Sequence, residues 1–175
     1  VEAVSNFSRA PEALRVLRNR FNTWKSLFKK DTGNVSEDVL KGLFGELYFL
    51  KNFMIPQYGV KNAVLAWGGP DNTHKDFSIG NEWYEIKTIN SFKNTVSISS
   101  IEQLDSLVEG KLVVYSFEKM SPSFNGISLN ALVGMVSNMI QYETDKDIFF
   151  EKLKQVGYSY NEVYDNYVYN MVNVD

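Results

Sequence analysis

The chain has 175 residues, no cysteine, one histidine and a formal net charge of −3 at pH 7. This length suits one domain with its own core, and the composition excludes disulfides and thiolate metal sites and disfavours zinc and histidine-relay chemistry. The charge gives no overall positive surface for nucleic acid, and no apolar run approaches the roughly 20 residues of a membrane span. We therefore expect a single cytoplasmic domain over residues 1–175 which, because it starts at Val1 in a helical pattern, is a fragment of a longer protein.

The first thirty residues predict a basic amphipathic helix. Pro11 suits the first turn of a helix, and apolar residues from Leu14 to Phe28 then recur at helical spacing. Positive charge gathers in the same segment, at Arg9, Arg15, Arg18, Arg20, Lys25, Lys29 and Lys30. A local contact with phosphates and an ordinary solvated helix face are both compatible with this pattern.

A second helix is expected from Ser36 to about Asn52. Ser36 is a suitable N-cap, and two acids follow it in the first turn, where they favour the helix dipole. Pro56 and Gly59 are expected to end this helix.

Glu46 is unusual in this second helix, because its neighbours at helical spacing are apolar residues and glycine. An acid in such surroundings points inward, and a buried carboxylate needs a hydrogen-bond partner or a metal. Gly42 and Gly45 indicate that another part of the chain packs closely against the helix. A bond to a buried backbone group or a pair with an arginine explains Glu46 as well as a metal does.

The rest of the chain alternates between strand and helix patterns, which predicts a mixed α/β domain. In the first half we expect a strand at Ala63–Trp67, a hairpin over residues 75–87, and either a strand or a loop at Thr95–Ser99. In the second half we expect a short helix through Val108, a strand at Leu112–Phe117, helices at Leu129–Tyr142 and Asp147–Val156, and a strand or hairpin within Tyr158–Val174.

The hairpin over residues 75–87 is the most informative segment. Gly80-Asn81 is a favoured two-residue turn, and it sets the expected pairs as Ile79 with Glu82, Ser78 with Trp83, Phe77 with Tyr84 and Asp76 with Glu85. Two carboxylates about 5 Å apart are unfavourable unless a cation lies between them. Lys87 shares a face with Glu85 because side chains alternate along a strand. The hairpin therefore predicts a divalent metal site with an ammonium beside it.

Each of these residues also has an ordinary explanation. Asp76 can be a polar residue at the start of a strand, and Glu85 and Lys87 can be a charge pair on a solvent face. The opposed acids, the lysine and the inward Glu46 together favour a functional site. Mg²⁺ takes carboxylate and phosphate oxygens, and an adjacent lysine can orient an attacking water. His74, at the edge of this site, is either an ordinary loop histidine or a contact to a phosphate or leaving group.

These residues carry a resemblance to a known group of enzymes. Asp76 followed by Glu85-Ile86-Lys87 resembles the PD-(D/E)XK signature of the restriction-endonuclease-like nuclease superfamily, and Glu46 resembles the helix-borne glutamate that many members place near the metal. The run Gly42–Leu50, with the aromatic helix before it, is similar to an uncharacterised bacterial family proposed to belong to that superfamily.

The resemblance implies an αβββαβ core with extra N-terminal and C-terminal helices. It also implies that Asp76, Glu85 and the Ile86 carbonyl bind Mg²⁺, with Mn²⁺ as a substitute. Glu46 would bind a second metal or a metal-bound water, and Lys87 would position or activate the attacking water.

Two further positions are compared with the signature. Lys75 precedes Asp76 where the signature has proline, which weakens the motif without breaking it. Gln103 resembles a position where some members place a polar site residue, although a plain helix-surface glutamine explains it better.

The function that the resemblance implies is a metal-dependent DNA endonuclease that hydrolyses phosphodiester bonds, in bacterial restriction or phage defence. Its partners would be DNA and either a second copy of the chain or a larger defence complex. The alternative is a non-catalytic module on the same fold that binds DNA or a partner protein, which the acidic net charge favours.

Overall fold

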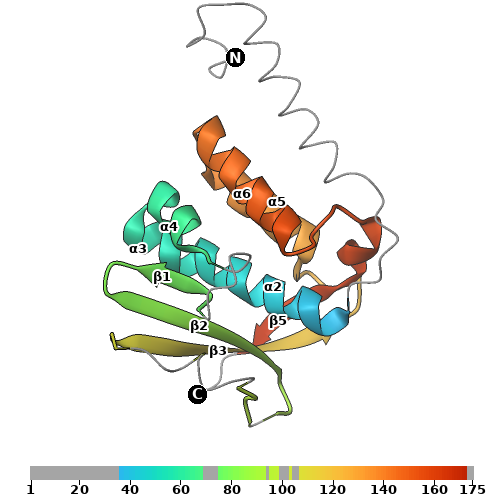
Figure 1. Ribbon diagram of the computed structural model, residues 1–175. Coiled ribbons are helices and arrows are strands. Elements are labelled where there is room, and N and C mark those ends of the chain that lie inside the picture. Colours follow the sequence, from blue (N-terminus) through green and yellow to red (C-terminus); the bar gives the residue numbers. More distant parts are fainter. Residues whose placement is uncertain (1–35, 69–74, 94, 99–102, 104–106, 173–175) are drawn as a thin grey trace, which may run out of the picture.

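The computed structural model of the chain describes residues 36–68, 75–93, 95–98, 103 and 107–172 (Figure 1). The predicted first helix, His74 and most of the predicted helix before Val108 lie outside the described residues.

The described chain begins with the second predicted helix, α2 (Glu37–Phe49). The Ser36 side chain accepts a hydrogen bond from the backbone N–H of Val39, as expected of an N-cap. The helical path then continues through a π-helical turn, η2 (Leu50–Met54), and α3 (Ile55–Tyr58). The expectation that Pro56 ends the helix is wrong, because Pro56 lies in the first turn of α3, where its missing N–H costs little. Gly59, with a φ of 78°, ends it.

The predicted strand at Ala63–Trp67 is also wrong, because these residues lie in or directly after a helix, α4 (Val60–Ala66). Leu65 is half exposed whereas its neighbours on both sides are buried, which is the spacing of a helix that packs on one side. Only Trp67 contacts the sheet through its backbone, as an isolated antiparallel bridge to Phe77.

Five strands form one mixed sheet, which confirms the expected α/β fold and is compatible with an αβββαβ core. The strands are β1 (Phe77–Ile79), β2 (Glu82–Asn90), β3 (Gly110–Met120), β4 (Ile127–Ser128) and β5 (Val168–Val172). Their order across the sheet is β1-β2-β3-β5-β4, with β2 and β3 parallel and the other neighbours antiparallel. β5 confirms a strand in the tyrosine-rich tail, β4 was not predicted, and residues 95–98 form a loop.

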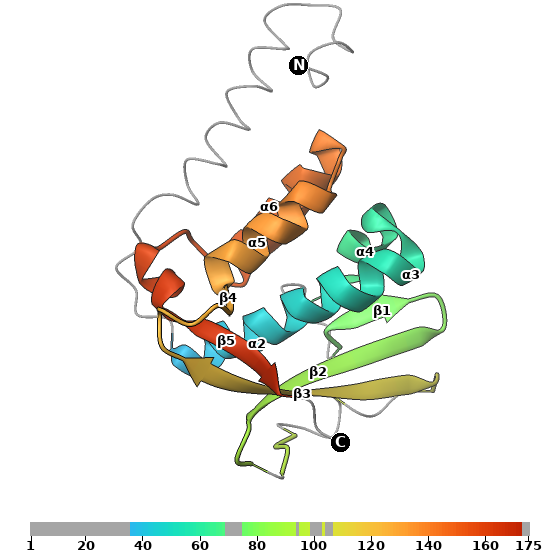
Figure 2. The same ribbon diagram turned by 180° about the vertical axis from the view of Figure 1, so that it is seen from behind.

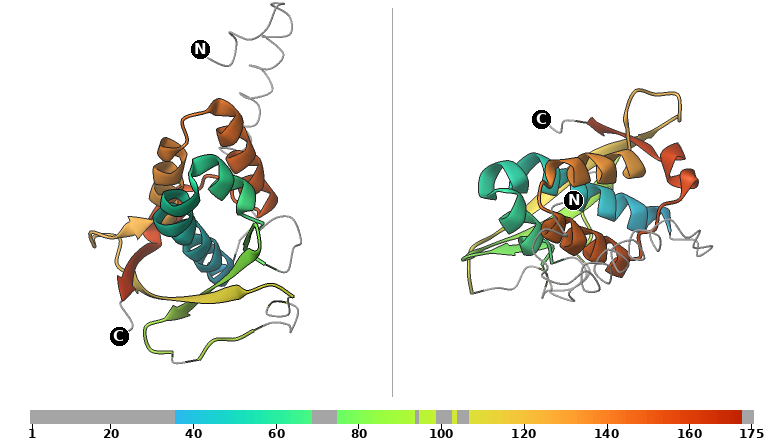
Figure 3. Two further views of the ribbon diagram at one scale, coloured as in Figure 1. Left: turned by 90° about the vertical axis from the view of Figure 1, so that its left-hand side faces the viewer. Right: turned by 90° about the horizontal axis from the view of Figure 1, so that it is seen from above.

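The helices lie on one side of this sheet in two layers (Figures 1 and 2). α2 lies directly on the strands, and α5 (Leu129–Met139) and α6 (Glu143–Gln155) lie on the other side of α2, as the end-on view in Figure 3 also shows. Both C-terminal helices confirm the sequence prediction, and Gly157, with a φ of 82°, follows the second of them. In the described segments, every helix is too short or too polar to cross a bilayer.

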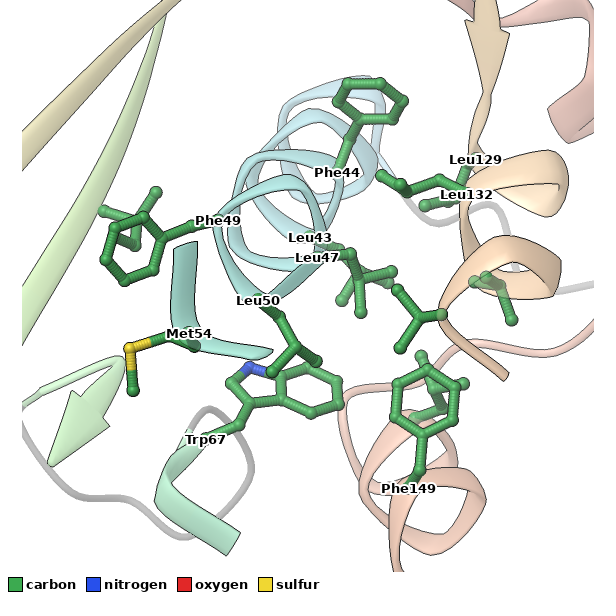
Figure 4. Packing of buried hydrophobic residues seen from close by; sticks show 14 of the residues in the cluster. Leu43, Phe44, Leu47, Phe49, Leu50, Met54, Trp67, Leu129, Leu132 and Phe149 are labelled. Carbon is green, nitrogen blue, oxygen red and sulfur yellow. The ribbon is translucent and has the colours of Figure 1, made fainter. Parts of the chain in front are cut away.

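The core surrounds α2 on both sides. Figure 4 shows Phe49 on the side of the strands, and Leu43 and Leu47 on the side of Leu129 and Leu132. These side chains are almost fully buried, so α2 is the central element of the domain.

Gly45 shows how closely α2 approaches β2. A Cβ atom at this position would lie 2.3 Å from the Thr88 side chain and 3.6 Å from that of Ile86. The close approach predicted from the two helix glycines is therefore confirmed at Gly45 but not at Gly42, where a Cβ would meet nothing within 4 Å.

Candidate functional site

The hairpin has the predicted register and holds Asp76 at its open end. Phe77 pairs with Tyr84, and the regular ladder stops there, one pair short of the predicted pair of Asp76 with Glu85. A continued ladder would give the backbone N–H of Ile86 a carbonyl acceptor on the other strand. Asp76 Oδ2 takes that place and accepts a hydrogen bond of 2.6 Å from this N–H. This bond fixes the carboxylate beside the uncovered edge of β2.

Glu85 and Lys87 form an ion pair on one face of β2. Lys87 Nζ lies 2.8 Å from Glu85 Oε1, and the Glu85 side chain is only 2% exposed whereas that of Lys87 is 19% exposed. A charge pair on a solvent face, the ordinary explanation of these two residues, therefore does not describe Glu85. A carboxylate buried this far from water needs a positive partner, and the ammonium supplies one.

Trp83 adds an aromatic wall to the same face of β2. Its ring lies over Gly110, where a Cβ atom would come within 1.7 Å of the indole, so a larger residue there would displace the ring. Trp83 Nε1 donates a hydrogen bond of 3.0 Å to the Val108 carbonyl, and the Lys75 ammonium lies 3.9 Å from the ring centroid. The indole thus anchors the start of β3 beside Glu85.

Trp67 connects Glu46 with the hairpin. Its Nε1 donates a hydrogen bond of 2.7 Å to Glu46 Oε2, and its backbone bridges to Phe77. The next residue, Gly68, donates its N–H to the Asp76 carbonyl over 2.8 Å. One short segment therefore holds the Glu46 carboxylate and the Asp76 backbone in fixed positions relative to each other.

The surroundings favour protons on two of the acids. Burial raises the pKa of Glu46 to about 8, and the charges of Asp76 and Glu85 add to this, while the bond from Trp67 and the charge of Lys87 act in the opposite direction. Burial also raises the pKa of Asp76 to about 6, assisted by Glu85 and opposed by the Ile86 N–H and by Lys87. Burial, more than the neighbouring charges, thus opposes ionisation of these two acids.

The donor atoms of the site fit a hard divalent cation. Carboxylate oxygens come from Asp76, Glu85 and Glu46, and the Ile86 carbonyl points to the same edge of β2 as its N–H, toward Asp76. Across the parts of the chain that the structure describes, no three acidic or histidine side chains come close enough to enclose a metal by themselves. A protein ligand set this incomplete is usual for Mg²⁺, which keeps several waters and binds substrate oxygens.

Two site residues were not found by sequence reasoning. The sequence places Trp67 only in an apolar run, and it marks Lys75 only as the residue that stands where the signature has proline. The Lys75 ammonium also donates a hydrogen bond of 2.6 Å to the Gln103 carbonyl. Gln103, which resembles a polar site position of the superfamily, therefore contacts the site through its backbone. Nothing in the spacing of these residues indicates such contacts, because each partner is distant in sequence.

Replacing Trp67 by phenylalanine is expected to raise the pKa of Glu46 further, by about one unit. The substitution keeps a buried ring and removes the N–H that stabilises the ionised carboxylate, an interaction worth roughly 1.5–3 kcal/mol when the acceptor is charged. A ¹³C NMR titration of the glutamate carboxyls measures the shift. Trp83→Phe is the matched control, since it removes a buried indole donor that bonds a carbonyl; an equal change in both variants would contradict the role given to Trp67.

Comparison with known proteins gives one match. A family model described as "Putative PD-(D/E)XK family member" (DUF4420) matches residues 1–174. No curated protein and no solved structure matches the chain.

Proposed function

The chain belongs to the DUF4420 family, and from this membership and the geometry around Asp76 we propose that it is a metal-dependent nuclease that hydrolyses phosphodiester bonds in DNA. One observation supports the proposal most. The buried Glu85–Lys87 pair brackets Ile86, and the N–H of that same Ile86 holds Asp76. The ion pair on the face of β2 and the Asp76 carboxylate at its edge are thus joined through one residue, Ile86.

The residues present suit the following roles. Asp76, Glu85 and the Ile86 carbonyl would hold Mg²⁺ or Mn²⁺, and Glu46 would complete the site through a second ion or a water molecule. When bound, the ion polarises a phosphoryl oxygen and lowers the pKa of water. Lys87 would orient the attacking water and stabilise the negative charge that builds on the phosphoryl group, since its ammonium is already fixed beside Glu85.

The biological setting of the proposal is bacterial restriction or phage defence, as a homodimer or within a larger complex. This setting is supported by the family resemblance.

A second candidate is a non-catalytic module that binds DNA or a protein on the same fold. The net charge of −3 favours it. Calorimetric titration with Mg²⁺ or Mn²⁺ separates the two: the nuclease is expected to bind at millimolar ion or below, and Glu85→Gln is expected to weaken that binding. No heat of binding at millimolar ion would support the module.

The nuclease proposal is tested directly by removing the metal. The protein is expected to cut supercoiled plasmid, single-stranded DNA or modified DNA when Mg²⁺ or Mn²⁺ is present, and excess EDTA is expected to abolish cleavage. RNA of the same sequence tests the choice of DNA. Asp76→Ala serves as the inactive control, and cleavage that persists in EDTA and in this variant would identify a contaminant or a different mechanism.

A further inference from the structure

A second feature of the molecule lies next to Lys87 but outside the group of acids. A cavity of about 580 Å³ is lined by the C-terminal half of β2 from Lys87 to Asn90, by α2 at Asp38 and Lys41, and by residues 93 and 95–97. Its volume falls within the usual range of ligand sites, about 300–1,000 Å³. Because Lys87 belongs both to this cavity and to the candidate catalytic site, the two are continuous.

The cavity concentrates positive charge in an acidic protein. Three lysines line it, Lys41, Lys87 and Lys93, against one acid, Asp38, while the whole chain has a net charge of −3. The side chains of Asp38 and Lys93 are exposed, so both lie at the rim. The interior of the cavity is therefore cationic.

Lys41 is the residue that an ordinary structural role explains least well. It is only 8% exposed, and its ammonium donates a hydrogen bond to Asn90 Oδ1, a neutral acceptor. Lysine is rarely buried to this degree without a carboxylate partner, and no ion pair involving Lys41 occurs within the described segments. Burial lowers the pKa of Lys41; Asp38 raises it and Lys93 lowers it.

Three hydroxyl groups of the cavity can also donate hydrogen bonds. Thr88, Thr95 and Ser97 contribute hydroxyls beside the lysines. Ammonium and hydroxyl donors around a cavity are the complement of phosphate oxygens, which accept several hydrogen bonds at once and repay the burial of a positive charge.

We propose that this cavity binds a backbone phosphate of the nucleic-acid strand, adjacent to the phosphate placed at Asp76 and Glu85, with Lys41 and Lys93 as its cationic contacts. The proposal rests on the proposed nuclease function in one respect, that the ligand is a nucleic-acid strand. Its test measures binding without cleavage. Lys41 and Lys93 are binding residues in this proposal, and the three acids of the candidate site do not line the cavity.

The test measures the binding of a fluorescent single-stranded oligonucleotide by anisotropy in EDTA, over a series of salt concentrations, for the whole chain. Each phosphate neutralised contributes a slope of about −0.7 in log K against log salt for a single strand. Because both lysines contact the same phosphate, Lys93→Gln and Lys41→Gln are each expected to make the slope less negative by up to about that amount and to weaken binding several-fold at about 0.1 M salt. Lys154→Gln, an exposed lysine on α6 away from the cavity, is the matched control.

Each outcome decides the proposal. Because Lys41 is buried and its replacement can unfold the protein, the exposed Lys93 variant decides the result if Lys41→Gln does not fold. Equal slopes in Lys93→Gln, Lys154→Gln and the unmodified protein would overturn the proposal. It would also be overturned if a free mononucleotide or inorganic phosphate competed for the site as effectively as unlabelled oligonucleotide does. Lys87→Ala is expected to make the slope less negative as well, because Lys87 also lines the cavity. Salt-sensitive binding that Lys93→Gln reduces, without any cleavage by the unmodified protein, would support the phosphate contact and refute the nuclease alone.

Discussion

Replacing Lys87 by alanine is expected to lower the rate of DNA cleavage by about 10² to 10³-fold, the effect of losing one fixed electrostatic contact to a developing negative charge. The Lys87 ammonium lies 2.8 Å from Glu85, so it is held in place before any substrate arrives. The loss is expected in the rate at saturating DNA, because the contact acts on the transition state. Single-turnover cleavage in Mg²⁺ measures it.

The control for this prediction is a second lysine–glutamate pair of equal length, which joins strand β3 to helix α2. Lys119 Nζ also lies 2.8 Å from a glutamate, Glu37, but both side chains are about half exposed. Lys119→Ala is expected to leave the rate unchanged, since exposed pairs contribute little. Near-UV circular dichroism of Lys87→Ala verifies that the fold survives the loss of the partner of the buried Glu85. Undiminished cleavage by Lys87→Ala and Asp76→Ala would end the assignment of this site.

The affinity for Mg²⁺ is expected to fall by up to about 100-fold between pH 8 and pH 6. Burial raises the pKa of Glu46 to about 8, so this carboxyl is about half protonated at pH 8 and almost fully protonated at pH 6, and a cation must displace that proton. Each unit of pH below the pKa then costs up to about tenfold in affinity. Asp76, with its pKa raised to about 6 mainly by burial, adds a further loss only near and below pH 6. Calorimetry at several pH values in buffers of different ionisation heat measures both the affinity and the protons released.

The same two acids give the metal-free protein an opposite dependence of stability on pH. A carboxyl whose pKa is higher in the folded state binds its proton more tightly there, so the free energy of unfolding is greatest when the group is protonated in both states. It decreases as the pH rises from the ordinary value of 4.5 through about 8 for Glu46, and from 3.8 through about 6 for Asp76. Glu46→Gln keeps an oxygen for the Trp67 N–H. It is expected to flatten the pH profile of Mg²⁺ affinity and the pH profile of stability. Profiles as steep in this variant as in the unmodified protein would contradict the assignment to Glu46.

The hairpin was predictable because its information is local. Gly80-Asn81 fixes the turn, and once the turn is fixed the alternation of side chains places Phe77 opposite Tyr84 and Lys87 on the face of Glu85. The inward direction of Glu46 was likewise readable from the apolar residues at helical spacing around it. The partner of that carboxylate could not be predicted, since within the described residues it accepts its hydrogen bond from the Trp67 indole and not from a backbone group or an arginine.

The errors have a common cause in short apolar runs. Five apolar residues at Ala63–Trp67 satisfy a strand and a buried helical turn equally well, and the packing of α4 against α6 and β1 decided between them. The burial of Lys41 could not be predicted from the sequence for a related reason. A lysine in a helix is normally solvated, and its burial depends on Asn90, which lies on a strand far along the chain.

The hydrogen bonds of Lys152 have a consequence for the order in which the molecule is made. Its ammonium, on α6, donates to the carbonyls of Leu65 and Trp67 at the end of α4, and Trp67 in turn holds Glu46. β5, the last strand along the chain, also lies inside the sheet between β3 and β4. A growing chain on the ribosome therefore has the acids of the hairpin long before it has the support that positions them. The group of acids reaches its final geometry only when nearly all of the described chain has been synthesised.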